Sequence, residues 1–61
     1  MNFEQARKEW LIAMEELMVA DRHAHRVARD ALPINAEDVT ILQALLADVG
    51  QRLERLLRRL S

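Results

Sequence analysis

Apolar residues recur at alternating three- and four-residue intervals over two long stretches of the chain. In the first stretch they are Phe3, Ala6, Trp10, Ala13, Leu17, Ala20, Ala24, Val27 and Ala31. In the second they are Val39, Leu42, Leu46, Val49, Leu53, Leu56 and Leu60. This spacing places each set on one side of an α-helix, as in helical bundles. The pattern predicts helices at residues 3–31 and 36–60, with these two seams in contact.

A short break separates the two predicted helices. Pro33 disfavours helical dihedral angles at the residue before it, so the first helix is expected to end near Ala31. Asn35 is a favourable N-cap for the second helix, and the carboxylate of Asp38 can return a hydrogen bond to complete a capping box. The turn, residues 32–35, has a length typical of links between packed helices. The chain is therefore predicted to be all-α and to form an antiparallel two-helix hairpin.

Charged residues are distributed in a way that favours the same antiparallel pairing. Residues 1–20 carry two basic and four acidic side chains, whereas residues 49–61 carry four basic side chains and one acidic. These two segments meet at the open end of the predicted hairpin, opposite the turn. Exposed ion pairs contribute only about 0–1 kcal/mol each, so they select the orientation of the helices more than they stabilise it.

The chain carries more apolar surface than one pair of helices can cover. It has 61 residues and no cysteine, so neither disulfides nor thiolate–metal sites can stabilise it. A second apolar stripe lies beside the first seam, at Leu11, Met14, Met18, Ala28 and Leu32. Monomers seldom leave such a face exposed to water. We therefore expect a homodimer that forms a four-helix bundle; the alternatives are a monomer with an exposed face and docking on a different protein.

The expected dimer or partner interface combines bulky residues from both helices. It is predicted to contain Trp10, Leu11, Met14, Leu17, Met18, Leu46, Val49 and Leu53. The methionines would form an adaptable part of that surface, because their side chains are flexible and polarizable. The pattern leaves open whether the two hairpins run parallel or antiparallel.

Few residues are suited to catalysis or metal binding. Asp21 and His25 are expected to pair within the helix, although two such pairs meeting in a dimer could hold a metal ion. His23 is expected to be solvated on the outermost face of the first helix. That face also holds Glu9, Glu16 and Asp30. Because the chain also lacks a glycine-rich phosphate loop, we expect no enzymatic activity, no bound metal and no cofactor.

Arginines form two groups that could contact phosphates. One group shares a face of the first helix, and the other crowds the last two turns of the second. The candidate phosphate contacts are Arg22, Arg26, Arg29, Arg52, Arg55 and Arg59. The C-terminal arginines would also complement the helix dipole without any ligand. The net charge of −1 argues against strong non-specific binding to nucleic acid.

The longest run without a charged residue, residues 39–47, is much shorter than the roughly 20 apolar residues that span a membrane. The N-terminus has no secretory pattern, since Glu4 precedes every basic residue. We therefore expect a cytoplasmic protein without a membrane span. A basic amphipathic C-terminal segment lying on an anionic membrane is a less favoured alternative, because its leucines continue the predicted seam.

These features together predict a small non-enzymatic binding or oligomerisation protein. It would act as an adaptor, regulator or chaperone-like module through a homodimeric helical bundle, with itself and another protein as partners. An RNA- or DNA-binding regulator that uses the arginines of the same dimer is the alternative. Binding that depends steeply on salt concentration would distinguish the second function from the first.

Overall fold

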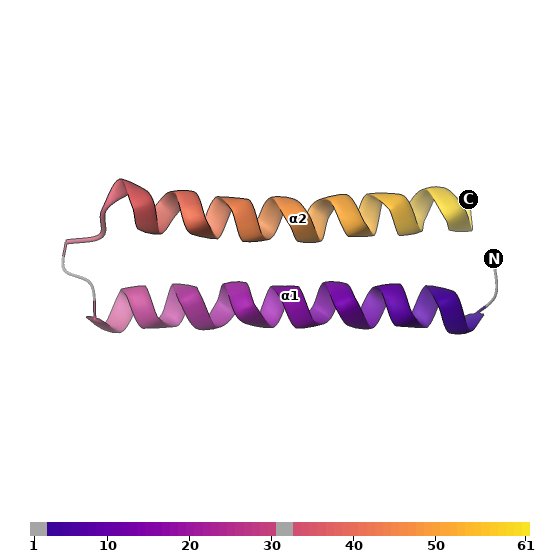
Figure 1. Cartoon of the computed structure of the whole chain (residues 1–61), viewed down its shortest axis with the longest axis horizontal. Helices are drawn as coiled ribbons and strands as arrows, with labels where there is room; N and C mark the ends of the chain where they lie inside the picture. Colours follow the sequence, from indigo (N-terminus) through magenta and orange to yellow (C-terminus); the bar gives the residue numbers. More distant parts are fainter. Residues whose placement is uncertain (1–2, 31–32) are drawn as a thin grey trace.

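The structure is a computed structural model that describes residues 3–30 and 33–61. Two long helices, α1 (Phe3–Asp30) and α2 (Ala36–Leu60), lie side by side and run in opposite directions (Figure 1). The molecule measures 46 × 16 × 10 Å, and the start of α1 and the end of α2 lie at the end opposite the turn. The predicted all-α hairpin is confirmed. The predicted helix end at Ala31 and the start of the turn at Leu32 lie outside the described residues.

The start of α2 has the predicted capping box. The Oδ1 atom of Asn35 accepts a hydrogen bond from the backbone N–H of Asp38 at 3.0 Å. The Oδ2 atom of Asp38 accepts one from the backbone N–H of Asn35 at 3.1 Å. These bonds satisfy backbone donors that lack a partner within the helix. The acidic side chains of Glu37 and Asp38 also complement the positive end of the helix dipole.

Replacing Asn35 with alanine is expected to lower the free energy of unfolding by about 1 kcal/mol, because a backbone N–H of α2 loses its acceptor. Urea denaturation followed by circular dichroism measures the change. The control Asn35→Asp keeps an acceptor at the cap and should remain close to the unaltered chain. An Asn35→Ala variant with unchanged stability would show that the capping box contributes nothing.

The contact between the helices is built from small residues of α1 and branched residues of α2. Ala13 and Ala20 are 4% and 2% exposed, and Val49 and Leu56 are 7% and 6% exposed. Within the described part of the chain, these four are the buried hydrophobic residues. Alanine lets two helix axes approach closely. Ala13 and Ala20, called here the alanine ridge, therefore form the line of closest packing between α1 and α2.

The bulky residues of the predicted first seam are only partly covered by α2, so the alanines of that seam make the closest contact and the bulky residues lie at its edge. Phe3, Trp10 and Leu17 are 95%, 58% and 48% exposed. Bulky residues and alanines alternate within one stripe of α1, and the rotation that turns the alanines toward α2 carries the bulky side chains to one flank. The residues that alternate with the alanines along the contact are polar: Glu9, Glu16 and His23.

Candidate functional site

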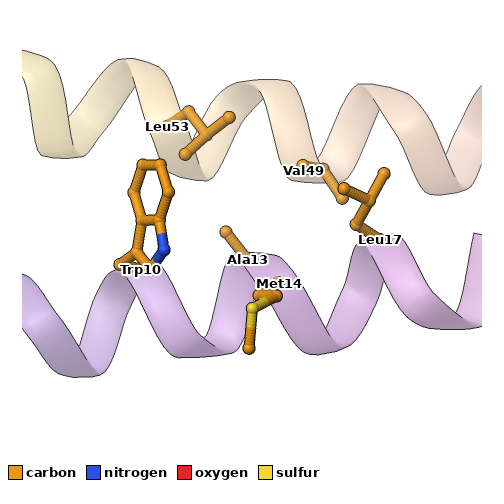
Figure 2. Close-up of a pocket in the computed structure, with 6 residues that line it drawn as sticks. All are labelled: Trp10, Ala13, Met14, Leu17, Val49 and Leu53. Atoms are coloured by element: carbon orange, nitrogen blue, oxygen red, sulfur yellow. The ribbon is translucent and has the colours of Figure 1, made fainter.

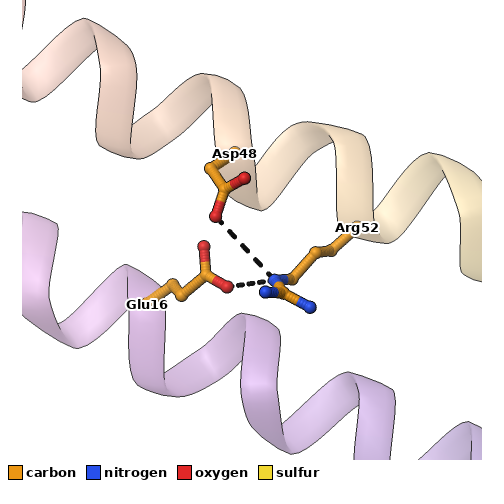
Figure 3. A network of polar contacts seen from close by, with 3 residues as sticks. All are labelled: Glu16, Asp48 and Arg52. Atoms are coloured by element: carbon orange, nitrogen blue, oxygen red, sulfur yellow. Dashed lines mark hydrogen bonds and ion pairs between the residues drawn. The ribbon is translucent and has the colours of Figure 1, made fainter.

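One flank of the hairpin is polar and ion-paired. Glu16 of α1 pairs with Arg52 of α2, and Oδ2 of Asp48 lies 3.8 Å from Nε of the same arginine (Figure 3). Nearer the chain ends, Glu9 pairs with Arg59. The side chains of Glu16 and Glu9 are only 22% and 25% exposed. The two pairs therefore lie at the edge of the helix contact, where they fix the register of α1 against α2.

Two carboxyl groups share the guanidinium of Arg52. The pKa of Glu16 is raised above 4.5, chiefly by a hydrogen bond with the side chain of Asp48 and further by desolvation. Arg52 acts in the opposite direction, through its hydrogen bond and its positive charge, and only partly offsets these effects. Negative charge is consequently in excess at the middle of this flank.

Replacing Asp48 with asparagine is expected to lower the pKa of Glu16, because the neighbouring carboxyl group is removed while Arg52 remains. A raised pKa in the folded state stabilises the fold below the unfolded-state pKa, and this contribution is lost as the pH rises through the folded-state pKa. The unaltered chain should therefore lose stability relative to Asp48→Asn as the pH rises through the folded-state pKa of Glu16. An NMR titration of the Glu16 carboxyl measures the shift, and an equal pKa in both chains would contradict this assignment.

His23 lies inside the hairpin, so its predicted position on an outer, solvated face is wrong. It is 8% exposed, and its Nε2 atom lies 3.2 Å from the backbone oxygen of Asp38. Its Nδ1 atom lies 3.4 Å from a terminal nitrogen of Arg26. A carbonyl only accepts and a guanidinium only donates, which selects the tautomer with hydrogen on Nε2. The buried ring thus links α1 to the start of α2 near the turn.

The other residues predicted on that outer face are divided by the fold. Glu9 and Glu16 belong to the polar flank described above, while Asp30 is exposed and lies 3.2 Å from Arg29. Asp21 and His25 form the predicted pair within α1, at 3.2 Å. In residues 3–30 and 33–61, no group of three or more histidine and acidic side chains is arranged to hold a metal ion.

The opposite flank is apolar and hollowed along its length. Near the open end, a hollow of about 130 Å³ is lined by Trp10, Ala13, Met14, Leu17, Val49 and Leu53 (Figure 2). The next, of about 470 Å³, is lined by Met14, Leu17, Met18, Ala20, Asp21, Ala24, Leu42 and Leu46. A third, of about 200 Å³, is lined by His23, Ala24, Val27, Ala28, Ile34, Asp38, Val39 and Leu42. Neighbouring hollows share residues, so together they form one continuous depression, called here the apolar groove.

The apolar groove contains most residues of the predicted interface. Those that line it are Trp10, Met14, Leu17, Met18, Leu46, Val49 and Leu53. Leu11 differs, because it does not line these hollows, although Met14 one turn away does. Lys8 and Glu15, which are also one turn from Leu11, are exposed. Ala24 and Leu42 join the hollows of the groove, although they were predicted only as part of the contact between the two helices. Both residues line the groove because α1 is rotated about its axis so that Ala13 and Ala20, and not the bulky residues of the same stripe, lie closest to α2.

The predicted arginine groups lie at opposite ends of the hairpin. Near the turn, Arg22, Arg26 and Arg29 line a hollow of about 360 Å³ together with His23 and His25. Near the chain ends, Arg52 and Arg59 pair with acidic side chains of α1, whereas Arg55 is exposed. The hairpin therefore does not bring all six candidate phosphate contacts into one site.

The fold and its surfaces define a two-helix hairpin with one ion-paired flank and one apolar flank. Comparison with protein-family models, with curated proteins and with solved structures finds no match to this chain. Neither α1 nor α2, over the residues that the structure describes, is long and apolar enough to pass through a bilayer.

Proposed function

We propose that this chain is a small non-enzymatic interaction protein that acts as a homodimer. Two hairpins would pack through their apolar grooves into a four-helix bundle, and this bundle would serve as an adaptor or regulatory module for another protein. The observation that carries the proposal is the apolar groove itself. It follows both helices and displays Trp10, Met14, Leu17, Leu46 and Leu53, which are all more than a third exposed.

A second copy of the chain suits the groove in size and chemistry. The broad face of the hairpin measures 46 by 16 Å, which is of the same order as the ~800 Å² per partner of a stable interface. Among the residues that the structure describes, Asp21 is the only charged one that lines the two hollows nearer the open end. Burying each leucine or methionine of the groove would contribute about 1.5–3 kcal/mol. The four residues buried between α1 and α2 supply far less apolar surface.

Analytical ultracentrifugation of the purified chain tests the proposal. The chain has a mass of 7.1 kDa, and we expect a compact helical species with twice that mass. A folded monomer at concentrations of tens of micromolar would overturn self-association. If that monomer also bound an apolar dye, the groove would be free for a different protein, which is the competing occupant.

Nucleic-acid binding is a second candidate function, favoured by the hollow between Arg22, Arg26 and Arg29. Arginine forks suit phosphate oxygens, and affinity for a polyanion falls as the salt concentration rises. A gel shift at low salt with RNA and with DNA tests it, using a variant with these three arginines replaced by glutamine. A chain with Arg55→Gln and Arg58→Gln, which are exposed at the far end, is the control. The absence of any shift at low salt would contradict this function.

A further inference from the structure

The size of the side chains changes along the apolar flank. At the open end it displays Trp10 and Leu53, with Leu57 and Leu60 following on the same side of α2 at 66% and 61% exposure. Nearer the turn, α1 lines the third hollow with His23, which is buried, with Ala24 and Val27, which are partly buried, and with Ala28, which is exposed. None of these is a bulky exposed side chain. On α1, the flank therefore carries bulky side chains near the open end and small exposed ones near the turn, whereas Ile34 and Val39 line the third hollow from the other side. A partner with the opposite taper would fit it better than a partner of uniform width.

We infer that the second copy in the proposed bundle lies antiparallel to the first, so that Trp10 of each copy fills the hollow over Ala24 of the other. This inference rests on the proposed function. In an antiparallel copy, the open end with its bulky side chains lies over the turn end of the first copy, where the exposed side chains of α1 are small. The same contact is then made twice, once on each side of a two-fold axis.

The register of the helices supports this arrangement. Leu17 lies near mid-length of α1, and it lines the first hollow together with Val49 of α2. Trp10 and Ala24 lie seven residues before and after Leu17, so an axis through Leu17 brings each onto the other in the partner. On α2, Leu46 and Leu53 are placed symmetrically about residues 49 and 50 and would meet in the same way.

Gly50 provides an independent observation at the same level. It is the only glycine of the chain, it lies within α2, and a Cβ atom there would meet nothing within 4 Å. No contact with the described residues of the hairpin therefore requires glycine at this position, although glycine weakens a helix. Leu46 and Leu53, one turn on either side, place Gly50 on the apolar flank. At the proposed axis, its missing side chain would let the partner's α2 approach closely.

A parallel arrangement fits the same surface poorly. It would place Trp10 of one copy against the leucines at the open end of the other, so that bulky residues meet bulky residues. At the turn end, Ala24 and Ala28 would face α2 of the other copy near Leu42 and Val39, so the crowded layer would be the one at the open end. Overfilling one layer of a packed interior forces side chains and helices apart and costs stability.

Distance measurement between labels at the C-terminus separates the two arrangements. The chain has no cysteine, so Ser61→Cys carries a single nitroxide away from the groove. In an antiparallel dimer the two labels lie at opposite ends, separated by about the 46 Å length of the hairpin in a pulsed electron resonance experiment. In a parallel dimer they would lie within roughly 20 Å, given helix spacings of 8–10 Å. A dimer with the short distance overturns this inference alone, whereas a folded monomer overturns the proposed function as well.

Cross-linking of mixed cysteine variants provides a second test within the groove. Trp10→Cys chains mixed with Ala24→Cys chains should form a mixed disulfide dimer on oxidation, and so should Leu46→Cys with Leu53→Cys. The control mixture, Trp10→Cys with Leu57→Cys, should not, because only a parallel dimer brings these residues together. The mixture of Leu46→Cys and Leu53→Cys chains retains Trp10, so it still tests the arrangement if Trp10→Cys weakens association. Cross-linking confined to the control mixture would overturn the antiparallel arrangement.

Discussion

Replacing Leu17 with aspartate is expected to dissociate the proposed dimer. Leu17 lines both hollows nearer the open end and lies at mid-length, where the two copies would place a pair of carboxylates close together. An unpaired charge in an apolar contact loses its hydration without gaining a partner. We expect the dissociation constant to rise by at least about a hundredfold, or ~2.7 kcal/mol. Sedimentation equilibrium measures the change.

Leu11→Asp is a matched control for this experiment. Leu11 is 40% exposed, close to the 48% of Leu17, but it does not line any of the three hollows that form the groove. The control should sediment as the unaltered chain does. A Leu17→Asp variant that stays dimeric would show that the groove is not the interface, and equal dissociation of both variants would show that the contact is not confined to the groove.

Replacing Ala20 with leucine is expected to cost about 1–3 kcal/mol of folding free energy. Ala20 is 2% exposed and belongs to the ridge along which α1 packs on α2. A leucine side chain there would separate the helices, and the displacement would strain the ion pairs that Glu9 and Glu16 make with α2. Urea denaturation monitored by circular dichroism at a fixed protein concentration measures the loss.

An exposed alanine provides the control for the second experiment. Ala47→Leu adds the same atoms to α2 at an exposed position, so its unfolding free energy should stay within about 0.5 kcal/mol of the unaltered chain. If Ala20→Leu were equally harmless, the alanine ridge would not be the line of closest packing. The bulky residues of α1 would then have to face α2 after all.

The hairpin could be predicted from the sequence because its signals are local. Pro33 interrupts one helix, and the bonds between Asn35 and Asp38 begin the next within four residues. Each signal depends on backbone geometry at its own position and not on distant contacts. The antiparallel packing then follows from the short link between two long apolar stripes.

The rotation of α1 could not be predicted from the same stripe. Alanines and bulky residues share one three- and four-residue spacing, so periodicity alone does not say which of them faces α2. The closer approach allowed by Ala13 and Ala20 decides between them. One signal was available in the spacing of the charges. Glu9 and Glu16 are seven residues apart, as are Arg52 and Arg59, which is the spacing of two ion pairs across antiparallel helices.

The position of His23 was missed for a different reason. A histidine in a polar segment of a helix is ordinarily assigned to solvent, because an unsatisfied polar ring is costly to bury. Here the ring is satisfied by the carbonyl of Asp38 and by Arg26. The Asp38 contact joins residues 15 positions apart across the turn, and a pattern within one helix does not reveal it.

In the proposed dimer, the small area enclosed between α1 and α2 would make folding and association a single thermodynamic event. Ala13, Ala20, Val49 and Leu56 are the hydrophobic residues that the described part of one hairpin buries. Most of the apolar surface removed from water would then be buried against the second copy. By mass action, the midpoint of thermal denaturation would therefore depend on protein concentration. On dilution, isolated hairpins would melt as they separate, so the cell could set the amount of active bundle through expression level alone.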